Sequence, residues 1–171
     1  MPMSDYVRGL RTQIGSSLLH MPSVSATLFD TENRLLIAQQ AGSSLWMTVG
    51  GAIEPDESPS DAAVREMWEE TGLHVVPMRV LGVFGGREFR VSYPNGDEAA
   101  YTVILFEVRL LGGTLRADRE EAAALRYVTA EEADALPMSE LTRILVRTGF
   151  ARPRAAHFTS PTWTPPEASR G

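Results

Sequence analysis

The sequence predicts one mixed α/β layered domain, and three observations lead to this fold class. Segments rich in β-branched and aromatic residues, which are typical of strands, recur along the chain. Two well-marked helical patterns accompany them. The length of 171 residues suits a single domain with room for its own core. Strands mixed with a few helices favour helices packed against a sheet.

The first part of the chain is expected to contain a short helix and the first strands. Apolar residues at helical spacing predict a helix or turn at residues 6–14. The stretches 23–29 and 34–39 have strand character, and the polar residues 30–33 between them predict a β-hairpin. A short strand is expected at 49–53, around the pair Gly50-Gly51.

The best-marked element is a helix at residues 59–71. Ser58 is a suitable N-cap, Pro59 suits the first helical position, and Asp61 stands where it can close a capping box. Gly72 is placed to end this helix in a left-handed conformation.

The second half of the chain predicts further strands, a last helix and a tail. Strands are expected at 73–84, 87–93, 99–111 and 125–128, with a turn at 94–97. Residues 139–148 have a helical pattern that Gly149 is expected to end.

The same features divide the chain into three parts. Residues 1–20 are expected to form an N-terminal helical or turn extension, and residues 21–150 the main domain. Residues 151–171 contain four prolines and little periodicity, which predicts a loose tail.

Composition narrows the classes of function. The chain has no cysteine, so a metal site has to use oxygen or imidazole ligands, and all sixteen basic residues are arginine. The net charge of −6 argues against a nucleic-acid binder or a binder of anionic membranes. No apolar run approaches the ~20 residues of a membrane-spanning helix, and the first twenty residues lack the apolar core of a secretory signal. We therefore expect a cytoplasmic protein with no membrane or nucleic-acid partner.

Three glutamates on the 59–71 helix are the first sign of chemistry. Glu66, Glu69 and Glu70 stand at positions i, i+3 and i+4 and so share one face of the helix. The opposite face is expected to pack on the domain through Val64, Met67 and Trp68. Because few cations stand nearby, the acidic face is either simply solvated or a set of hard oxygen ligands for Mg²⁺ or Mn²⁺.

The residues around these glutamates distinguish the two interpretations. The segment 51–73 reads GAIEPDESPSDAAVREMWEETGL, with apolar residues at 67 and 73. Its other defined positions are Gly51, Glu57, Arg65, Glu66, Glu69, Glu70 and Gly72. This spacing resembles the signature of the Nudix hydrolases, the MutT-like family, at every defined position. The run 93–98, YPNGDE, is similar to one in a bacterial subgroup of that family, and the similarity covers roughly residues 6–150.

The resemblance implies a fold and a reaction. The fold would be an α/β/α sandwich with a mixed β-sheet, in which a loop–helix–loop holds divalent cations beneath a diphosphate. The reaction would be hydrolysis by water attack at phosphorus, in a nucleoside diphosphate-linked or nucleoside triphosphate substrate, with Mg²⁺ or Mn²⁺ as cofactor. ADP-ribose, nucleotide sugars, dinucleoside polyphosphates and oxidised nucleoside triphosphates stay open as substrates. The alternative is a Nudix-like sensor that binds nucleotides without cleaving them, and a homodimer is the oligomer that relatives suggest.

The resemblance also implies roles for single residues. Glu69 and Glu70 would be the main carboxylate ligands, and the carbonyl of Gly50 a backbone ligand. Glu66 would be a further ligand or the base that activates the attacking water. Arg65 would orient a neighbouring carboxylate for catalysis. Glu57 would contact the residues that bind the metal, on the side away from the metal, or it would merely connect the loop to the helix.

A distal acid and substrate contacts complete these expectations. Glu121 has the best offset for an additional acid from a distant loop, and the competing residues are Glu120, Asp97 and Glu98. Arg87 and Arg90 follow a glycine pair and are candidates for phosphate contact, although exposed strand arginines are common without such a role. Tyr93 is the third candidate for substrate contact.

Overall fold

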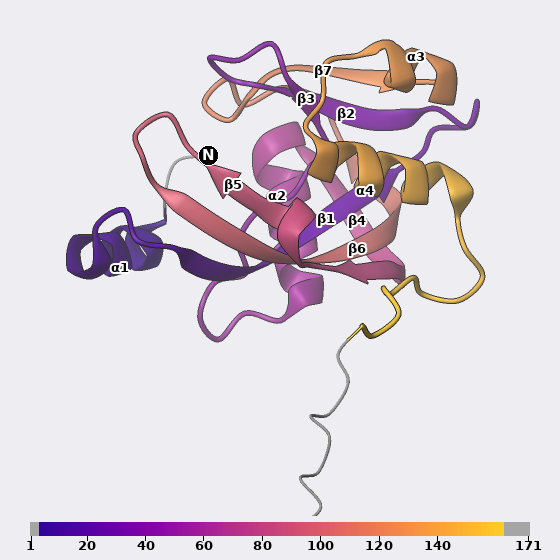
Figure 1. Ribbon diagram of the computed structural model, residues 1–171. Helices are drawn as coiled ribbons and strands as arrows, with labels where there is room; N and C mark the ends of the chain where they lie inside the picture. Colours follow the sequence, from indigo (N-terminus) through magenta and orange to yellow (C-terminus); the bar gives the residue numbers. More distant parts are fainter. Residues whose placement is uncertain (1–3, 163–171) are drawn as a thin grey trace, which may run out of the picture.

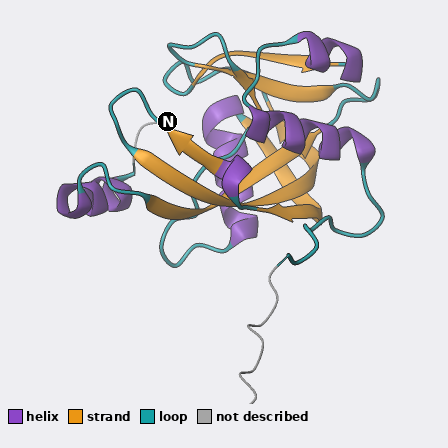
Figure 2. Cartoon of the chain, in the orientation of Figure 1, coloured by secondary structure: helices purple, strands orange, loops and turns teal. Residues whose placement is uncertain are grey.

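The computed structural model describes residues 4–162, as helices, strands and connecting loops (Figure 1, Figure 2). Residues 1–3 of the expected extension and residues 163–171 of the expected tail lie outside the described part. The elements are α1 (Asp5–Ile14), β1 (Leu19–Leu28), β2 (Leu35–Gln40), β3 (Trp46–Met47), α2 (Pro59–Thr71), β4 (Leu73–Phe84), the 3-10 turn η1 (Arg87–Phe89), β5 (Arg90–Ser92), β6 (Glu98–Gly113), β7 (Ala122–Val128), α3 (Ala130–Ala135) and α4 (Glu140–Ala151).

The strands form two sheets. In the main sheet the order is β1-β6-β4, and β5 also pairs with β6. Strand β1 runs parallel to β6, from Leu19 opposite Ala99 to Leu28 opposite Val108, while β4 and β5 are antiparallel to β6. The small sheet has the order β3-β2-β7 and is antiparallel.

Helices cover both faces of the main sheet, which confirms the expected α/β/α layering with a mixed sheet (Figure 1). Side chains alternate along β6, as the pleat requires. Phe106 and Val108 belong to the core cluster that contains Met67 of α2, whereas Val103 and Leu105 belong to the cluster that contains Leu145 of α4. The α2 side thus carries one core and the α4 side another.

The predicted hairpin at residues 23–39 is wrong. Strands β1 and β2 lie in different sheets, and a single bridge between Phe29 and Leu35 joins them beside the turn. Strand β1 pairs with β6 along one edge, and its other edge bonds the loop that was expected as a strand at 49–53. Backbone N–H groups of Val24 and Ala26 donate to Gly51 and Val49, so this loop is held against β1 by isolated bridges.

The expected end of the last helix is also wrong. Gly149 lies inside α4, where an added Cβ would come within 2.8 Å of a methyl carbon of Thr27. The glycine therefore allows a close approach of α4 to β1, and the helix ends at Arg152 in a left-handed conformation. Helix α3 was not expected, although Thr129 and Glu132 form a capping box at its start.

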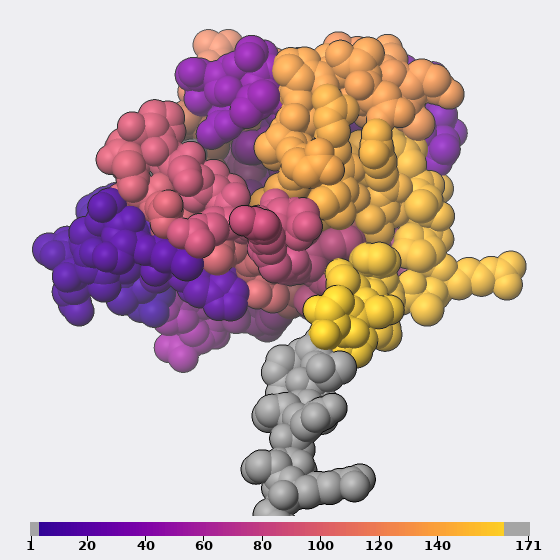
Figure 3. Space-filling model, in the orientation of Figure 1, coloured from indigo at the N-terminus to yellow at the C-terminus, as the bar shows by residue number. Residues whose placement is uncertain are grey.

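The two ends of the described chain contact the main sheet differently. Helix α1 projects from the body and lies beside the turn 93–97 (Figure 3), where Arg11 donates to the carbonyl of Glu98. Residues 152–162 form no helix or strand, yet the backbone of His157 exchanges hydrogen bonds with Leu81 and Val83 of β4. No helix within residues 4–162 is long and apolar enough to cross a membrane.

Candidate active site

Helix α2 begins and ends where the sequence predicts. The Ser58 hydroxyl accepts the backbone N–H of Asp61 at 3.1 Å, and Gly72 ends the helix with φ of 69°. The expected capping box differs in detail. The Asp61 carboxylate accepts a hydrogen bond from the Ser58 hydroxyl at 2.7 Å, so this contact joins the two side chains and does not reach a backbone N–H.

Two of the three glutamates on the acidic face of α2 point into the protein. Glu66 and Glu70 are 6% and 0% exposed, whereas Trp68 is 52% exposed. The prediction that Trp68 packs on the domain is therefore wrong, while Met67 beside it is fully buried. Two carboxylates therefore lie at positions that apolar side chains usually occupy. Removing them from water costs free energy, so a compensating charge is expected nearby.

The pair Gly50-Gly51 brings the backbone close to these carboxylates. The N–H of Gly50 donates to Oε1 of Glu70 at 3.1 Å, and Oε2 of Glu70 is buried with no hydrogen-bond partner. A Cβ at Gly51 would lie 2.3 Å from Oε1 of Glu66. A Cβ at Gly50 would lie 2.3 Å from the carbonyl oxygen of Val24. Glycine at position 50 thus lets the loop lie against the backbone of β1, and glycine at position 51 leaves room for the Glu66 carboxylate.

Arg65 ties the loop to the helix. Its Nε and Nη2 donate to the two carboxylate oxygens of Glu57, at 2.8 and 3.0 Å. Its Nη1 donates to Glu66 Oε1 at 2.8 Å and to Glu69 Oε2 at 3.1 Å. Nη2 also donates to the carbonyl of Ala52 at 3.0 Å. One guanidinium is therefore shared among three carboxylates.

Glu121 joins the helix glutamates from a distant loop. Carboxylate oxygens of Glu66, Glu70 and Glu121 lie within 4.8 Å of one another. The loop before β7 is fixed because the Asp118 carboxylate accepts the backbone N–H groups of residues 120–122. Sequence offset alone selected Glu121 among the candidate distal acids, and the structure brings it to the cluster.

Burial determines the protonation of this cluster. Burial raises the pKa of Glu66 to about 7, although Arg65 opposes the shift. Burial, and then the neighbouring Glu66 carboxylate, raise the pKa of Glu70 well above its ordinary value, and burial also raises the pKa of Glu121. In contrast, the hydrogen bonds from Arg65 lower the pKa of Glu57. Three crowded carboxylates with an orphaned buried oxygen fit a hard divalent cation.

The other expected site residues lie at different places. Glu69 is exposed, lies outside the cluster of three and bonds Arg65. Glu120 is exposed beside Glu121. Arg87 and Arg90 are exposed and do not line the cleft described below, and Arg90 pairs with Glu98 at 2.6 Å.

A cleft of about 1020 Å³ opens beside the glutamate cluster. Its wall includes Tyr93, whose hydroxyl lies 2.5 Å from that of Tyr101, and Asp97, whose carboxylate lies 3.7 Å from Nε of Arg11. Tyr101 and Arg11 were not among the expected site residues. No local pattern identifies them, because both join the cleft through contacts between distant segments.

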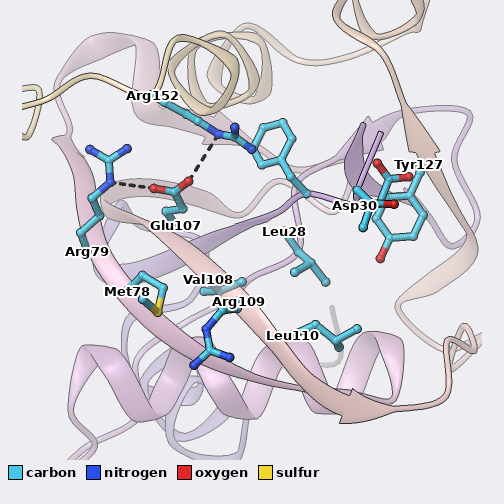
Figure 4. A pocket seen from close by; sticks show the side chains of 12 residues that line it. Leu28, Asp30, Met78, Arg79, Glu107, Val108, Arg109, Leu110, Tyr127 and Arg152 are labelled. Carbon is cyan, nitrogen blue, oxygen red and sulfur yellow. Dashed lines mark hydrogen bonds and ion pairs between the residues drawn. The ribbon is translucent and has the colours of Figure 1, made fainter. Parts of the chain in front are cut away.

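A second pocket, of about 760 Å³, lies toward the other end of the paired strands β1 and β6 (Figure 4). Met21 and residues 23–25 line the cleft, whereas residues 28–31 line this pocket. Glu107 accepts a hydrogen bond from Nε of Arg79 at 2.6 Å and lies 3.3 Å from Nε of Arg152. The Arg152 guanidinium stacks 3.9 Å from the ring centre of Phe29.

Comparison with known proteins places this geometry in a family. Residues 19–148 match the family model described as NUDIX domain. A MutT-like protein of Streptomyces ambofaciens is 29% identical over 114 residues, which cover 67% of this chain and 67% of that protein. A putative 8-oxo-dGTP diphosphatase of Bacillus subtilis (strain 168) is 31% identical over 102 residues, covering 60% of this chain and 62% of that protein.

Solved structures agree on the fold. The crystal structure of a UDP-X diphosphatase has a TM-score of 0.64 with this chain at 22% sequence identity, covering 86% of this chain and 70% of that one. At this level of identity the likeness establishes the arrangement of helices and strands, and the chemistry has to be argued from the residues.

Proposed function

Since the chain belongs to the NUDIX family, we propose that it hydrolyses a diphosphate linkage in a nucleotide-like substrate with the help of Mg²⁺ or Mn²⁺. The observation that carries this proposal is the state of Glu70. Its carboxylate is fully buried, one oxygen accepts the N–H of Gly50, and the other oxygen has no partner although Glu66 and Glu121 lie beside it.

Glu66, Glu70 and Glu121 would hold the cation, together with the carbonyl of Gly50 and with Glu69 at the exposed edge. Carboxylate and carbonyl oxygens are the ligands that Mg²⁺ and Mn²⁺ prefer. When bound, such a cation neutralises phosphate charge and lowers the pKa of bound water.

The chain's own residues then orient the reactants and move a proton. Arg65 holds Oε1 of Glu66, which leaves Oε2 free of hydrogen bonds among the described residues. We assign Glu66 as the base that takes a proton from the attacking water, with Glu121 as the competing base. The water oxygen forms a bond to phosphorus, and the bond from that phosphorus to the bridging oxygen breaks.

Arg65 acts through Glu66 and Glu57 and is a positioning residue. Its contacts with Glu57 and Ala52 join the loop 50–57 to α2, so the carbonyl of Gly50 and the helix glutamates keep one arrangement. Tyr93 and Tyr101 line the part of the cleft that would receive the nucleotide. Arg87 and Arg90, the expected phosphate contacts, do not line this cleft, so we assign them no part in it.

The test is turnover of a substrate panel with and without Mg²⁺ or Mn²⁺. The panel contains ADP-ribose, nucleotide sugars, nucleoside triphosphates and dinucleoside polyphosphates, with released phosphate, pyrophosphate or mononucleotide as the signal. A Glu70→Gln variant is expected to lose roughly 100-fold or more in kcat/KM. Glu120→Gln, an exposed neighbour of Glu121, is the matched control and is expected to keep its rate.

Two outcomes are informative. Metal-dependent turnover that collapses only in Glu70→Gln supports the proposal. Nucleotide binding without turnover of any compound would contradict it and favour the sensor.

A further inference from the structure

The second pocket shares no lining residue with the cleft and has a different balance of charge. Its volume of about 760 Å³ lies within the range of roughly 300–1,000 Å³ that small-molecule sites occupy. Three guanidinium groups line it, from Arg79, Arg109 and Arg152, whereas the chain as a whole carries a net charge of −6. Arginines gathered around a cavity of an acidic protein create a local positive potential that attracts anions.

Two carboxylates also line this pocket, and one of them is neutralised from outside it. The Asp30 carboxylate accepts a hydrogen bond from Nε of Arg34 at 2.8 Å, and Arg34 does not belong to the lining. Asp30 also accepts the backbone N–H groups of Glu32 and Arg34. Only Glu107 therefore offsets the three guanidinium groups, which leaves the lining with an excess of two positive charges.

Most N–H groups of these arginines have no partner within residues 4–162. Arg79 donates from Nε to Glu107 and from Nη1 to the carbonyl of Pro153, both at 2.6 Å, and its side chain makes no other hydrogen bond to the described residues. Nε of Arg152 is buried without a hydrogen bond, although it lies 3.3 Å from Glu107. The Arg109 side chain is exposed and forms neither a hydrogen bond nor an ion pair within the described part of the chain. Figure 4 shows its guanidinium apart from the network around Glu107.

The backbone at Arg152 supports a role for its side chain in this pocket. Arg152 follows α4 in the left-handed region with φ of 42°, a conformation that favours glycine at the end of a helix. An arginine there accepts backbone strain, and its guanidinium lines the pocket 3.9 Å from the ring centre of Phe29. Strained residues of this kind concentrate at sites that bind ligands.

Apolar side chains complete the lining. Met78 and Leu110 are 55% and 45% exposed, so both offer surface to a ligand. Leu28 and Val108 are buried and contribute to the wall, and the half-buried Tyr127 adds an aromatic ring. Guanidinium groups beside apolar surface suit a ligand that joins an anionic group to an apolar body.

We propose that the second pocket binds a phosphate monoester with an apolar or aromatic body, and that Arg109 is its main charged contact. A phosphate monoester carries a charge of roughly −1.5 to −2 at pH 7, which matches the excess of two positive charges in the lining. Its terminal oxygens accept hydrogen bonds from guanidinium groups, whereas a carboxylate brings one charge only. The proposal is independent of the proposed function, because it uses no residue of the glutamate cluster.

The experiment follows backbone amide signals by nuclear magnetic resonance while phenyl phosphate, benzoate or inorganic phosphate is added. A chelator keeps divalent cations out of the glutamate cluster, so phosphate finds no metal ion in the cleft. We expect phenyl phosphate to shift the signals of residues 28–31 and 107–110. It should bind roughly tenfold more tightly than benzoate, which has the same ring and less charge. It should also bind roughly threefold to tenfold more tightly than inorganic phosphate, which lacks the ring.

Variants then test Arg109. Arg109→Ala is expected to raise the dissociation constant of phenyl phosphate by roughly tenfold, because a charge-assisted hydrogen bond is lost. Arg109→Lys keeps the charge without the planar fork and is expected to raise this constant by roughly threefold. Arg87→Ala removes an exposed arginine that lines neither cavity and is expected to leave the constant unchanged. Far-ultraviolet circular dichroism checks that each variant is folded.

The outcomes either support the proposal or overturn it. Shifts at the second pocket that weaken in Arg109→Ala and persist in Arg87→Ala support it. Absence of binding at millimolar phenyl phosphate, unchanged affinity in folded Arg109→Ala, or shifts confined to residues 50–54 of the cleft would each overturn it. Benzoate bound as tightly as phenyl phosphate would overturn the assignment to a phosphate monoester. Glu70→Gln is expected to bind phenyl phosphate as the unchanged protein does, so failure of the proposed function would leave this site in place.

Discussion

The cleft and the second pocket use the same two side-chain types in opposite proportions. In the second pocket two guanidinium groups, of Arg79 and Arg152, share the single carboxylate of Glu107 (Figure 4). In the cleft one guanidinium, of Arg65, is shared among three carboxylates, and the buried Glu70 has only a backbone N–H.

This difference separates a structural ion network from a cluster whose negative charge is not balanced by the described residues. Around Glu107 every carboxylate oxygen has a cationic neighbour, and Arg79 also donates to the carbonyl of Pro153, which ties the end of α4 to the main sheet. Around Glu70 the negative charges outnumber the positive ones, so the cluster is complete only when protons or a metal ion enter it.

The largest effect is expected for Glu66→Gln. If Glu66 is the base, the amide removes proton acceptance while nearly keeping the shape of the side chain, and kcat should fall by about 10²–10⁴-fold with little change in KM. Steady-state kinetics with the best substrate of the panel measures this, and calorimetric titration of Mn²⁺ checks that metal still binds. A larger loss of kcat in Glu121→Gln than in Glu66→Gln would transfer the role of base to Glu121.

Arg65→Ala should affect both stability and rate. Removal of the guanidinium leaves the half-buried Glu57 and the buried Glu66 without their cation, which we expect to cost about 2–3 kcal/mol in the free energy of unfolding. The loop then loses its link to α2, so kcat should fall as well. Urea denaturation and kinetics measure the two effects.

The matched control for that variant is Arg126→Ala. Arg126 pairs with Glu132 at 3.3 Å where both side chains are more than 40% exposed, so its loss should change stability by no more than about 0.5 kcal/mol. Equal destabilisation by the two variants would contradict the role assigned to the Arg65 contacts.

The metal-free protein should become less stable as pH rises from 5 to 8. The pKa of Glu66 in the folded protein is about 7, above the ordinary glutamate value of 4.5, so between these values the folded state holds a proton that the unfolded state has lost. The free energy of unfolding therefore falls with rising pH across this window, by on the order of 1–3 kcal/mol. Mg²⁺ should restore stability at pH 8 and change it little at pH 5, because metal and protons compete for one cluster.

This pH dependence is measured as the melting temperature of the protein, in a chelator and with added Mg²⁺. A melting temperature of the metal-free protein that rises between pH 5 and pH 8 would show that the cluster is not held protonated by burial. The chelator-treated protein at pH 5 serves as its own reference for the Mg²⁺ effect.

Local sequence signals predicted the elements nearest the chemistry. The bounds of α2 agree with residues 59–71 because Ser58 and Gly72 act within one turn of the helix ends. The spacing of Glu66 and Glu70 was likewise sufficient to put both carboxylates on one face. Which way that face points was not predictable, since the burial of the two glutamates depends on contacts with Gly50 and Arg65 that form only in the folded chain.

The contacts between segments that are distant in the sequence were not predicted. The rule that neighbouring strands pair predicted a hairpin, yet β1 pairs in parallel with β6, about eighty residues along the chain. Arg11 reaches Glu98 across 87 residues, and no pattern around either residue signals that contact. The role of Gly149 was likewise not predictable from the sequence. Only the folded structure shows that Thr27 occupies the space where a Cβ at position 149 would lie.

The smallest effect on activity is expected for Glu107→Gln in the second pocket. The amide oxygen can still accept the hydrogen bond from Arg79, but the charge that attracts Arg152 is lost, and because these arginines are more than a third exposed, we expect a cost of only about 1 kcal/mol. Neither kcat nor the melting response to Mg²⁺ should change, since the network is complete without a metal. Urea denaturation and kinetics on the same preparation check both statements. A loss of Mg²⁺ response in Glu107→Gln would mean that the two cavities are coupled through β1 and β6, and the contrast between a structural network and a cluster with unbalanced negative charge would then no longer hold.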